Sequence, residues 1–341
     1  MGNGYELSQD RKRTIGKVIK EISPDIIHIF GTEFAHSLEC VQAAPVRMKL
    51  IVSTQGLVSE LAKVYTKKIP VMEQVLRASH SVSLLEEKYE FYRRGINERA
   101  ILKEAPNVIG RTAWDKQCVK KLNPDCRYFY CSETMRGAFY EGKWNIDNIR
   151  RHSIYISQAN YPIKGFHVFI KALGEVMKCF PDTRVYVAGR NVLQQTGSEY
   201  GRYINKLMEK YEVKNSIKFL GLIPAEKVRE RLLNVHITVM PSLLENSPNS
   251  IGEALILGTP VVAACVGGVP SLVRNEKEAL LYSNHSARQL AECINRVFSN
   301  DNLARMLSYN GCRRAAKLYD RDANLEQLLE IYDALIRRNK L

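Results

Sequence analysis

The stretch that decides the fold is Pro241-Ser-Leu-Leu-Glu245-Asn-Ser-Pro-Asn-Ser250-Ile-Gly-Glu253-Ala-Leu-Ile-Leu-Gly258-Thr-Pro260. An apolar run that ends at Met240 precedes it, and a second apolar run, Val261–Ala264, follows it. Between these runs a polar, proline-containing loop leads into a helix that we expect to begin at Ser250. A strand, loop, helix and strand in this order are typical of a parallel α/β sheet, in which ligands bind outside the carboxyl ends of the strands.

Strand and helix signals alternate in the same way through the rest of the second half. The pattern predicts strands at 153–157, 184–188, 217–220, 237–240, 260–264 and 279–282. Helices are predicted at 165–179, 199–211, 225–234, 250–257, 287–299, 302–317 and 324–338. The alternation in the second half therefore predicts a complete doubly wound domain.

The first half offers fewer strands. A helix at 10–22 precedes four short strand signals at 26–30, 49–53, 107–110 and 128–130, and a long, basic helical stretch covers 58–103. The polar segment 141–152 is the expected linker. We therefore predict one domain at 1–145, a second at 146–320, and a C-terminal helix within 321–341.

The composition narrows the class of protein. With 341 residues, 45% hydrophobic and 25% charged, the chain is long enough for two packed domains and is unlike disordered or collagenous chains. A formal charge of +14 indicates an anionic partner, but the charge is spread over both halves, which argues against nucleic acid. The eight cysteines form no C-x-x-C pair, no signal peptide pattern opens the chain, and the longest apolar run, 254–268, is too short to cross a bilayer. These features predict a cytoplasmic protein.

Two carboxylates, Glu245 and Glu253, lie eight residues apart in the deciding stretch. Taken singly, Glu253 completes a capping box with Ser250, and Glu245 is a solvated loop residue. Taken together at the end of a strand, they are better explained as acceptors for the hydroxyls of a sugar or a ribose. Lys164 is expected in the first turn of a helix, where a cation opposes the helix dipole, and this favours an anion beside it over a lysine that only reaches solvent.

The stretch resembles the E-x7-E motif of glycosyltransferase family 4, whose members are retaining, sugar-nucleotide-dependent enzymes of the GT-B fold. The resemblance runs from Lys164 to Tyr282 and includes Phe219-Leu-Gly221, Gly258-Thr-Pro260 and Gly267-Gly268. It implies an α/β, GT-B-like fold of two Rossmann-like doubly wound domains with a cleft between them, and a final helix that crosses back to the first domain. Family members have a longer stretch before the segment matching Asp25-Ile-Ile-His28, so the N-terminal domain is expected to be incomplete, without the usual first strand and Gly-rich turn.

The resemblance also implies roles on the donor side. Glu253 would hold the ribose hydroxyls of a nucleoside diphosphate sugar, and Glu245 the sugar that is transferred. Lys164 stands at the lysine position that stabilises the leaving diphosphate, while the usual arginine is replaced by Gln158. Arg111, from the first domain, is the candidate to supply the missing charge, and a surface arginine near a helix start is the alternative. The donor-binding residues expected are Glu253, Ser250, Ile251, Asn249, Gly165, Gly221 and Gln158.

The first domain is expected to bind the acceptor. Only His28 represents the H-x-H pattern of the family, because Phe30 replaces the second histidine. A histidine that is satisfied within the core is the alternative. The other acceptor-side candidates follow the strands at 26–30 and 49–53, and they are Gly31, Thr32, Glu33 and Gln55.

The hypothesis that follows is a retaining glycosyltransferase that moves a hexosyl group to an acceptor hydroxyl, in a saccharide or a lipid-linked saccharide of capsule, exopolysaccharide or cell-envelope glycan synthesis. A non-catalytic sugar-nucleotide-binding fragment, and an epimerase or phosphorylase on the same fold, stay open as alternatives. No metal or cofactor is expected, because cations and helix N-termini neutralise phosphate. Asp320-Arg-Asp322 is formally a D-x-D metal motif, but we expect Asp322 to cap the last helix. The basic stretch 58–103 would lie on the inner face of an anionic membrane, with solvated helix faces as the alternative.

Overall fold

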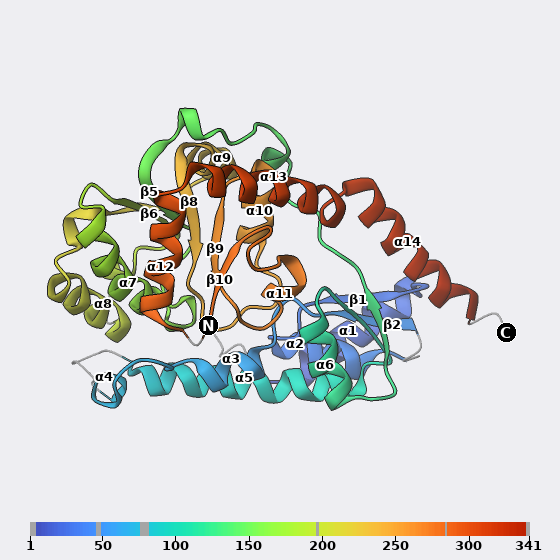
Figure 1. Ribbon diagram of the computed structural model, residues 1–341. Helices are drawn as coiled ribbons and strands as arrows, with labels where there is room; N and C mark the ends of the chain where they lie inside the picture. The colour runs from blue at the N-terminus through green and yellow to red at the C-terminus, as the bar shows by residue number, and fades with distance from the viewer. Residues whose placement is uncertain (1–4, 46–48, 76–81, 196–197, 284, 339–341) are drawn as a thin grey trace. The chain divides into compact units, whose positions relative to one another are not determined.

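The computed structural model describes residues 5–45, 49–75, 82–195, 198–283 and 285–338, which form two compact units (Figure 1). Unit 1 consists of Met1–Lys63, Lys88–Thr134 and Asp320–Leu341, and unit 2 consists of Val64–Glu87 and Met135–Tyr319. The division between Thr134 and Met135 comes earlier than the boundary predicted at 145, and the last helix belongs to unit 1.

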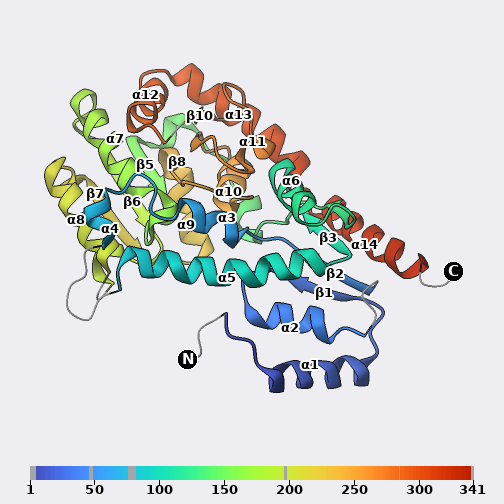
Figure 2. The ribbon, with the colours of Figure 1, turned by 90° about the horizontal axis from the view of Figure 1, so that it is seen from below.

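Unit 1 is built on a parallel sheet whose four strands follow chain order, β1-β2-β3-β4. The strands are β1 (Ile27–Phe30), β2 (Leu50–Ser53), β3 (Asn107–Gly110) and β4 (Arg127–Tyr130). The helices are α1 (Gln9–Ile22), α2 (Ala35–Ala43), α3 (Val58–Val64), α6 (Ala113–Leu122), α14 (Arg321–Arg338) and, from Lys88 on, α5 (Leu84–Glu104). Figure 2 shows α1 and α2 side by side.

Alternate residues of these strands serve two different cores, as the pleat of a strand requires. Leu50 and Val52 of β2 pack with Val41 of α2 and residues of α5 and α6. Ile51, on the opposite face of the same strand, packs with Ile331 of α14. Helix α14 is therefore held to the sheet of unit 1 by apolar burial.

The basic helical stretch that we predicted at 58–103 consists of several helices. It divides into α3, the short helix α4 (Val71–Val75) and α5. Pro70 stands directly before α4, and Lys68 has a positive φ of 64°, so the chain turns between α3 and α4. Residues 76–81 of the stretch lie outside the described part, and 64–87 belong to unit 2 and not to the first domain.

Unit 2 is a parallel sheet of six strands in the order β10-β9-β8-β5-β6-β7, which is the doubly wound arrangement. The strands are β5 (Arg150–Ile156), β6 (Arg184–Ala188), β7 (Ile217–Gly221), β8 (Val235–Met240), β9 (Val261–Ala264) and β10 (Leu280–Tyr282). The helices that join or follow them are α7 (Phe166–Cys179), α8 (Glu199–Lys210), α9 (Ala225–Asn234), α10 (Asn249–Leu257), α11 (Val269–Leu272), α12 (Ala287–Phe298) and α13 (Asp301–Leu318).

Two apolar cores cover the two faces of this sheet. Helices α7, α8 and α12 contribute to one core, and α9, α10, α11 and the end of α13 contribute to the other. The polar segment 141–152 is anchored to unit 2 and is not a free linker, because Trp144 is buried and its indole Nε1 donates to the carbonyl oxygen of Val235 at 2.8 Å. Met135 and Phe139 are buried in the second core, which explains why unit 2 begins before 145.

The longest apolar run, 254–268, is divided between two elements. It completes α10, passes through Gly258 in the left-handed conformation (φ 82°), and then forms β9. Within the described ranges, the structure holds no helix that is long and apolar enough to span a membrane.

Candidate active site

An ion pair bridges the point where the strand order of unit 2 reverses. Strands β5 and β8 are neighbours there, and the chain that leaves β5 carries Lys164, while the chain that leaves β8 carries Glu245. The Lys164 ammonium lies 2.7 Å from Glu245 Oε1, and the Ser242 hydroxyl donates to the same oxygen at 2.8 Å. Ligands of doubly wound sheets bind at this switch point, outside the carboxyl ends of the strands.

Two glycines bring the backbone close enough for this contact. Gly165 has φ 66°, and a Cβ atom there would lie 1.9 Å from the carbonyl oxygen of Pro241. Gly267 has φ 50°, and its Cβ would lie 2.1 Å from the carbonyl oxygen of Glu245. The same carbonyl accepts a hydrogen bond from the Gly268 N–H at 3.0 Å. The loop that carries Glu245 is thus held from both sides by positions where only glycine fits.

Lys164 keeps its charge although it is mostly enclosed. The side chains of Lys164 and Glu245 are 18% and 15% exposed. Burial acts to lower the pKa of Lys164, but the Glu245 carboxylate and the Tyr161 hydroxyl outweigh burial and raise this pKa above the ordinary lysine value. Lys164 is therefore a fixed cation at neutral pH, in a place where water screens it weakly.

The second carboxylate, Glu253, pairs with an arginine and does not close a capping box. Helix α10 begins at Asn249 with Pro248 in the cap position, and no side chain caps its first turn. Arg136 donates to Glu253 Oε1 at 2.6 Å from a position 117 residues away in sequence. Burial raises the pKa of Glu253, and Arg136 offsets part of this rise. The capping box with Ser250, which was the alternative interpretation of Glu253, is therefore excluded.

Of the expected donor-binding residues, Asn249, Ser250 and Ile251 form the first turn of α10, and the resemblance implies that the backbone N–H groups of Ser250 and Ile251 face the donor. Asn249 is exposed and Ser250 is half-buried. The Ile251 N–H already donates to the carbonyl oxygen of Pro248 at 3.0 Å, and the Ile251 side chain is buried in the core. In this arrangement the Ile251 N–H is not available to an anion, in contrast to our expectation.

Gln158 and Gly221 lie at the same edge of the sheet. Gln158 follows β5, and Gly221 ends β7 with φ 72°. Gly189, after β6, connects them, because its N–H donates to the carbonyl oxygen of Gly221 at 3.0 Å and an added Cβ would lie 3.5 Å from Gln158 Cγ. The structure thus groups these predicted donor-side positions at the carboxyl ends of three neighbouring strands.

In unit 1, His28 of β1 uses both ring nitrogens. Nδ1 lies 2.6 Å from the Tyr332 hydroxyl, and Nε2 lies 2.7 Å from the Ser53 hydroxyl. The imidazole stacks on Phe30 with ring centroids 3.9 Å apart. Burial lowers the pKa of His28 to about 4, so the ring is neutral at pH 7. These contacts favour a structural histidine that orients the end of β1.

The residues after β1 include one carboxylate oxygen that is poorly satisfied. Thr32 is buried and its hydroxyl donates to Glu98 Oε2 at 3.3 Å. Glu33 Oε2 is buried and has no hydrogen-bond partner among the residues that the structure describes. Gly31, with φ 88°, lies beside it, since an added Cβ would be 2.9 Å from the same oxygen. Gln55, after β2, is exposed.

Arg111 follows β3 and forms an ion pair with Glu133, and its side chain is 12% exposed. Both residues belong to unit 1. The Arg111 backbone N–H donates to Asp115 Oδ2 at 2.9 Å, so both its backbone and its side chain are engaged within this unit.

Comparison with known proteins identifies the family. The model of the family described as glycosyl transferases group 1 matches residues 139–314, which is more than half of the chain. The chain belongs to this family. The match covers the Lys164 and Glu245 ion pair, Glu253 and the whole switch point of unit 2.

Among curated relatives, the D-inositol 3-phosphate glycosyltransferase of Corynebacterium urealyticum is 26% identical over 173 residues, which are 51% of this chain and 41% of that protein. The chain thus matches about two fifths of that relative's length. The fold is similar to sucrose-phosphate synthase from Thermosynechococcus elongatus, with a TM-score of 0.74, 20% identity, and coverage of 96% of this chain and 77% of that one. It is also similar to Anabaena HepE in complex with UDP, with a TM-score of 0.71, 16% identity, and coverage of 94% and 82%. These likenesses establish a GT-B fold of two parallel-sheet α/β domains.

Two residues of the site were missed from sequence. Ser242 is adjacent to the motif and carries a hydroxyl, which was a usable signal. Arg136 lies within 1–145, which we assigned to the first domain, and no local pattern indicated that it contacts Glu253.

As far as the described ranges extend, there is no group of three or more His, Cys, Asp or Glu side chains that could hold a metal ion. Asp320 Oδ1 accepts the Ala323 N–H at 2.9 Å at the start of α14. Asp320, and not Asp322 as predicted, therefore occupies the capping position of the last helix.

Proposed function

We propose that this chain is a retaining family 4 glycosyltransferase that moves a hexosyl group from a nucleoside diphosphate sugar to an acceptor hydroxyl. The observation that carries the proposal is the Lys164 and Glu245 ion pair across the switch point of unit 2. A lysine whose pKa is raised and a carboxylate fixed by two glycines provide a cation for the diphosphate and an acceptor for sugar hydroxyls at one place.

The donor contacts follow from the hydrogen bonds already made. An ammonium has three N–H groups. Lys164 directs one of them to Glu245, and the Tyr161 hydroxyl is a second hydrogen-bond partner, so the remaining N–H is proposed to bind the diphosphate. Both Lys164 and Ser242 use Oε1 of Glu245, which leaves Oε2 to accept a sugar hydroxyl. Arg136 binds Oε1 of Glu253 and offsets part of the rise that burial causes in the pKa of this carboxylate, and Oε2 is proposed to accept a ribose hydroxyl.

The proposed reaction needs no side-chain base. The acceptor oxygen attacks the anomeric carbon on the face from which the diphosphate leaves, the bond from this carbon to the phosphate oxygen breaks, and the acceptor proton passes to that oxygen. The products are the glycoside and a nucleoside diphosphate. Lys164 stabilises the charge that develops on the leaving phosphate, as a preorganised cation does in a weakly screened site. We propose that the reaction requires no metal ion.

A uridine nucleotide is the first donor to test, since HepE, similar to this chain in fold, has been solved with UDP and with UDP-glucose. The test is to incubate the protein with a panel of UDP-, GDP- and dTDP-sugars and short saccharide or polyprenyl-phosphate-linked acceptors, and to assign the anomeric configuration of the product by NMR. We expect transfer with retention, and its loss in Lys164→Met. The matched control is Lys227→Met on α9, whose lysine pairs only with Glu230 among the described residues.

The same assay separates the alternatives. Binding of a donor without transfer in the wild-type protein would favour a non-catalytic binding protein. Conversion of the sugar nucleotide alone would indicate an epimerase, and consumption of inorganic phosphate would indicate a phosphorylase. Inversion at the anomeric carbon would contradict the proposed mechanism.

For the acceptor, we propose a lipid-linked saccharide that is met at the inner face of the cell membrane. On α5, Tyr89, Tyr92 and Ile96 recur at helical spacing and are 56%, 49% and 43% exposed. Arg99 stacks over the Tyr92 ring at 5.8 Å, so basic and aromatic groups share this face. Such a face suits the interface of an anionic bilayer.

Co-sedimentation with vesicles tests the membrane contact. We expect binding to vesicles of phosphatidylcholine with 30 mol% phosphatidylglycerol, about tenfold weaker binding for Tyr89→Ser/Tyr92→Ser, and no change for Leu222→Ser, which alters an exposed apolar residue of unit 2. Equal binding by all three proteins would contradict the membrane proposal and would leave the donor site untouched.

A further inference from the structure

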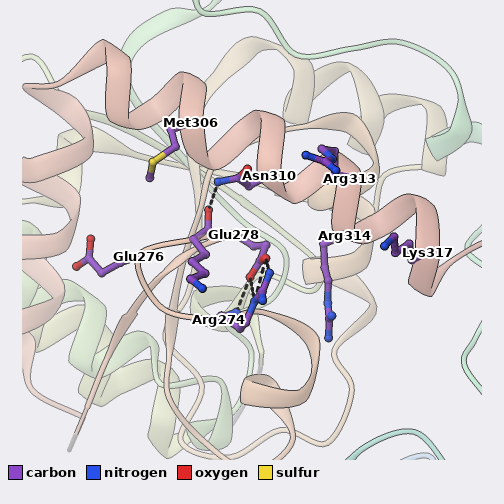
Figure 3. A pocket seen from close by; sticks show the side chains of 9 residues that line it. Arg274, Glu276, Glu278, Met306, Asn310, Arg313, Arg314 and Lys317 are labelled. Carbon is purple, nitrogen blue, oxygen red and sulfur yellow. Dashed lines mark hydrogen bonds and ion pairs between the residues drawn. The ribbon is translucent and has the colours of Figure 1, made fainter.

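A cavity of about 550 Å³ lies between α13 and the loop 274–278, on unit 2 (Figure 3). This loop leads into the amino end of β10, whereas the loop of Glu245 leaves the carboxyl end of β8. Because all strands of the sheet are parallel, amino and carboxyl ends lie at opposite edges. The cavity is therefore separate from the proposed donor site.

The lining of this cavity carries uncompensated positive charge. Its two acidic residues are both occupied: Glu278 pairs with Arg274, and Glu276 forms a bidentate pair with Arg296 at 2.6 and 2.8 Å. Four further cations line the cavity and have no carboxylate within ion-pair distance in the described part of the chain. They are Lys277, Arg313, Arg314 and Lys317.

The wall formed by α13 presents one face of a helix. Asn310, Arg313, Arg314 and Lys317 follow one another at intervals that place them on the same side. Arg314 is held in place, because its guanidinium donates to the carbonyl oxygens of Ser271 at 2.9 Å and Leu272 at 3.2 Å. Figure 3 shows Arg314 extending from α13 on the same side as Arg274.

The opposite wall is also fixed by hydrogen bonds. The Glu278 side chain is 3% exposed, and its carboxylate accepts the backbone N–H of Arg274 at 2.9 Å as well as the guanidinium. Asn310 joins the two walls by donating to the carbonyl oxygen of Lys277 at 3.0 Å. The cations are thus carried on a preorganised frame, so little ordering is needed when a ligand binds.

We propose that this cavity binds a small molecule that carries a phosphomonoester group. Guanidinium groups match the oxygens of phosphate in geometry and charge, and two ammonium groups add to the field. The volume is that of a site for a metabolite-sized ligand. The exposed Met306 and the Asn310 side chain, on the same wall, supply an apolar and a polar contact for the rest of the molecule.

The experiment uses the full chain and isothermal titration calorimetry at constant ionic strength. The titrants are glucose 6-phosphate, with glucose and sodium chloride as controls, and vesicles of phosphatidylcholine with or without 20 mol% phosphatidic acid. The variant is Arg313→Glu/Lys317→Glu. Its matched control is Lys178→Glu/Arg288→Glu, which makes the same change in net charge at exposed positions of α7 and α12.

We expect saturable binding of glucose 6-phosphate, weakened at least tenfold in Arg313→Glu/Lys317→Glu and unchanged in the control variant. Saturable binding of phosphatidic acid vesicles alone, with the same dependence on Arg313 and Lys317, also supports a phosphomonoester site and identifies a lipid as its source. Three results would overturn the proposal. In the first, the two variants lose binding to the same extent. In the second, neither glucose 6-phosphate nor phosphatidic acid vesicles bind more weakly to Arg313→Glu/Lys317→Glu, and in the third the wild-type protein binds neither of them. Circular dichroism of each variant confirms that it is folded.

Discussion

Replacing Gly165 by alanine tests how the candidate site is built. The left-handed φ of 66° costs an alanine about 1 to 2 kcal/mol, and its Cβ would also lie 1.9 Å from the carbonyl oxygen of Pro241. Relief of this overlap requires the loop to move by more than an ångström, at a further cost of about 1 to 3 kcal/mol. Because Glu245 is carried on that loop, the 2.7 Å contact with Lys164 should break.

Gly221→Ala is the matched control, because Gly221 has a similar φ of 72° and nothing lies within 4 Å of its added Cβ. Both variants are destabilised by the backbone strain, and only Gly165→Ala is destabilised further by the overlap with Pro241. For a domain of the size of unit 2, the extra destabilisation corresponds to a lowering of Tm by roughly 2 to 12 °C relative to Gly221→Ala. Differential scanning calorimetry measures this difference.

The proposed transfer activity provides a second readout of the same variant. A displacement of about 1 Å in a positioning residue costs on the order of 10²-fold in rate, so kcat/KM of Gly165→Ala should fall by about this factor. If Gly165→Ala has the same Tm as Gly221→Ala and its crystal structure retains the contact between Lys164 and Glu245, Gly165 does not hold the loop in the way described.

Three further predictions concern the ion pair of Glu253, the protonation of His28 and the metal requirement. Arg136→Met leaves the buried Glu253 without its cation, so the pKa of Glu253 rises further. Because a raised carboxylate pKa removes stability as pH increases through it, urea unfolding should show a loss of about 1 to 2 kcal/mol relative to wild type at pH 7.5 and little loss at pH 5. Equal losses at the two pH values would contradict this prediction. Because the pKa of His28 is lowered to about 4, the neutral ring contributes stability that is complete above pH 6.5 and declines as pH falls toward 4. His28→Gln should therefore flatten the dependence of the free energy of unfolding on pH in this range. An unaltered slope would show that His28 does not contribute to it. Transfer activity, once a donor is found, should persist in 5 mM EDTA, and its abolition with rescue by Mg²⁺ or Mn²⁺ would show that a metal is required.

The strands of unit 2 were predictable because each is a short apolar run with a turn signal after it. The prediction for β6 coincides with Arg184–Ala188, where Pro181 stands before the run and Gly189 after it. Gly258 likewise separates α10 from β9. These boundaries depend on local backbone preferences, which a sequence records directly.

Contacts between distant residues explain part of what the sequence did not reveal. The capping-box alternative for Glu253 is excluded because Pro248 occupies the cap position and because Glu253 binds Arg136, which is far away in sequence. The domain boundary at 145 was misplaced because a polar segment was taken as a linker, although Trp144 is buried within it. The division of 58–103 into separate helices has a local signal, because Pro70 stands directly before α4.

Titration of the protein with UDP, GDP and dTDP by calorimetry tests the central claim most directly. We predict saturable binding of at least one of these nucleotides, weakened at least tenfold in Lys164→Met and in Glu253→Gln and unchanged in Lys227→Met. Binding that is insensitive to both site substitutions, or no binding of any nucleoside diphosphate by the wild-type protein, would contradict it.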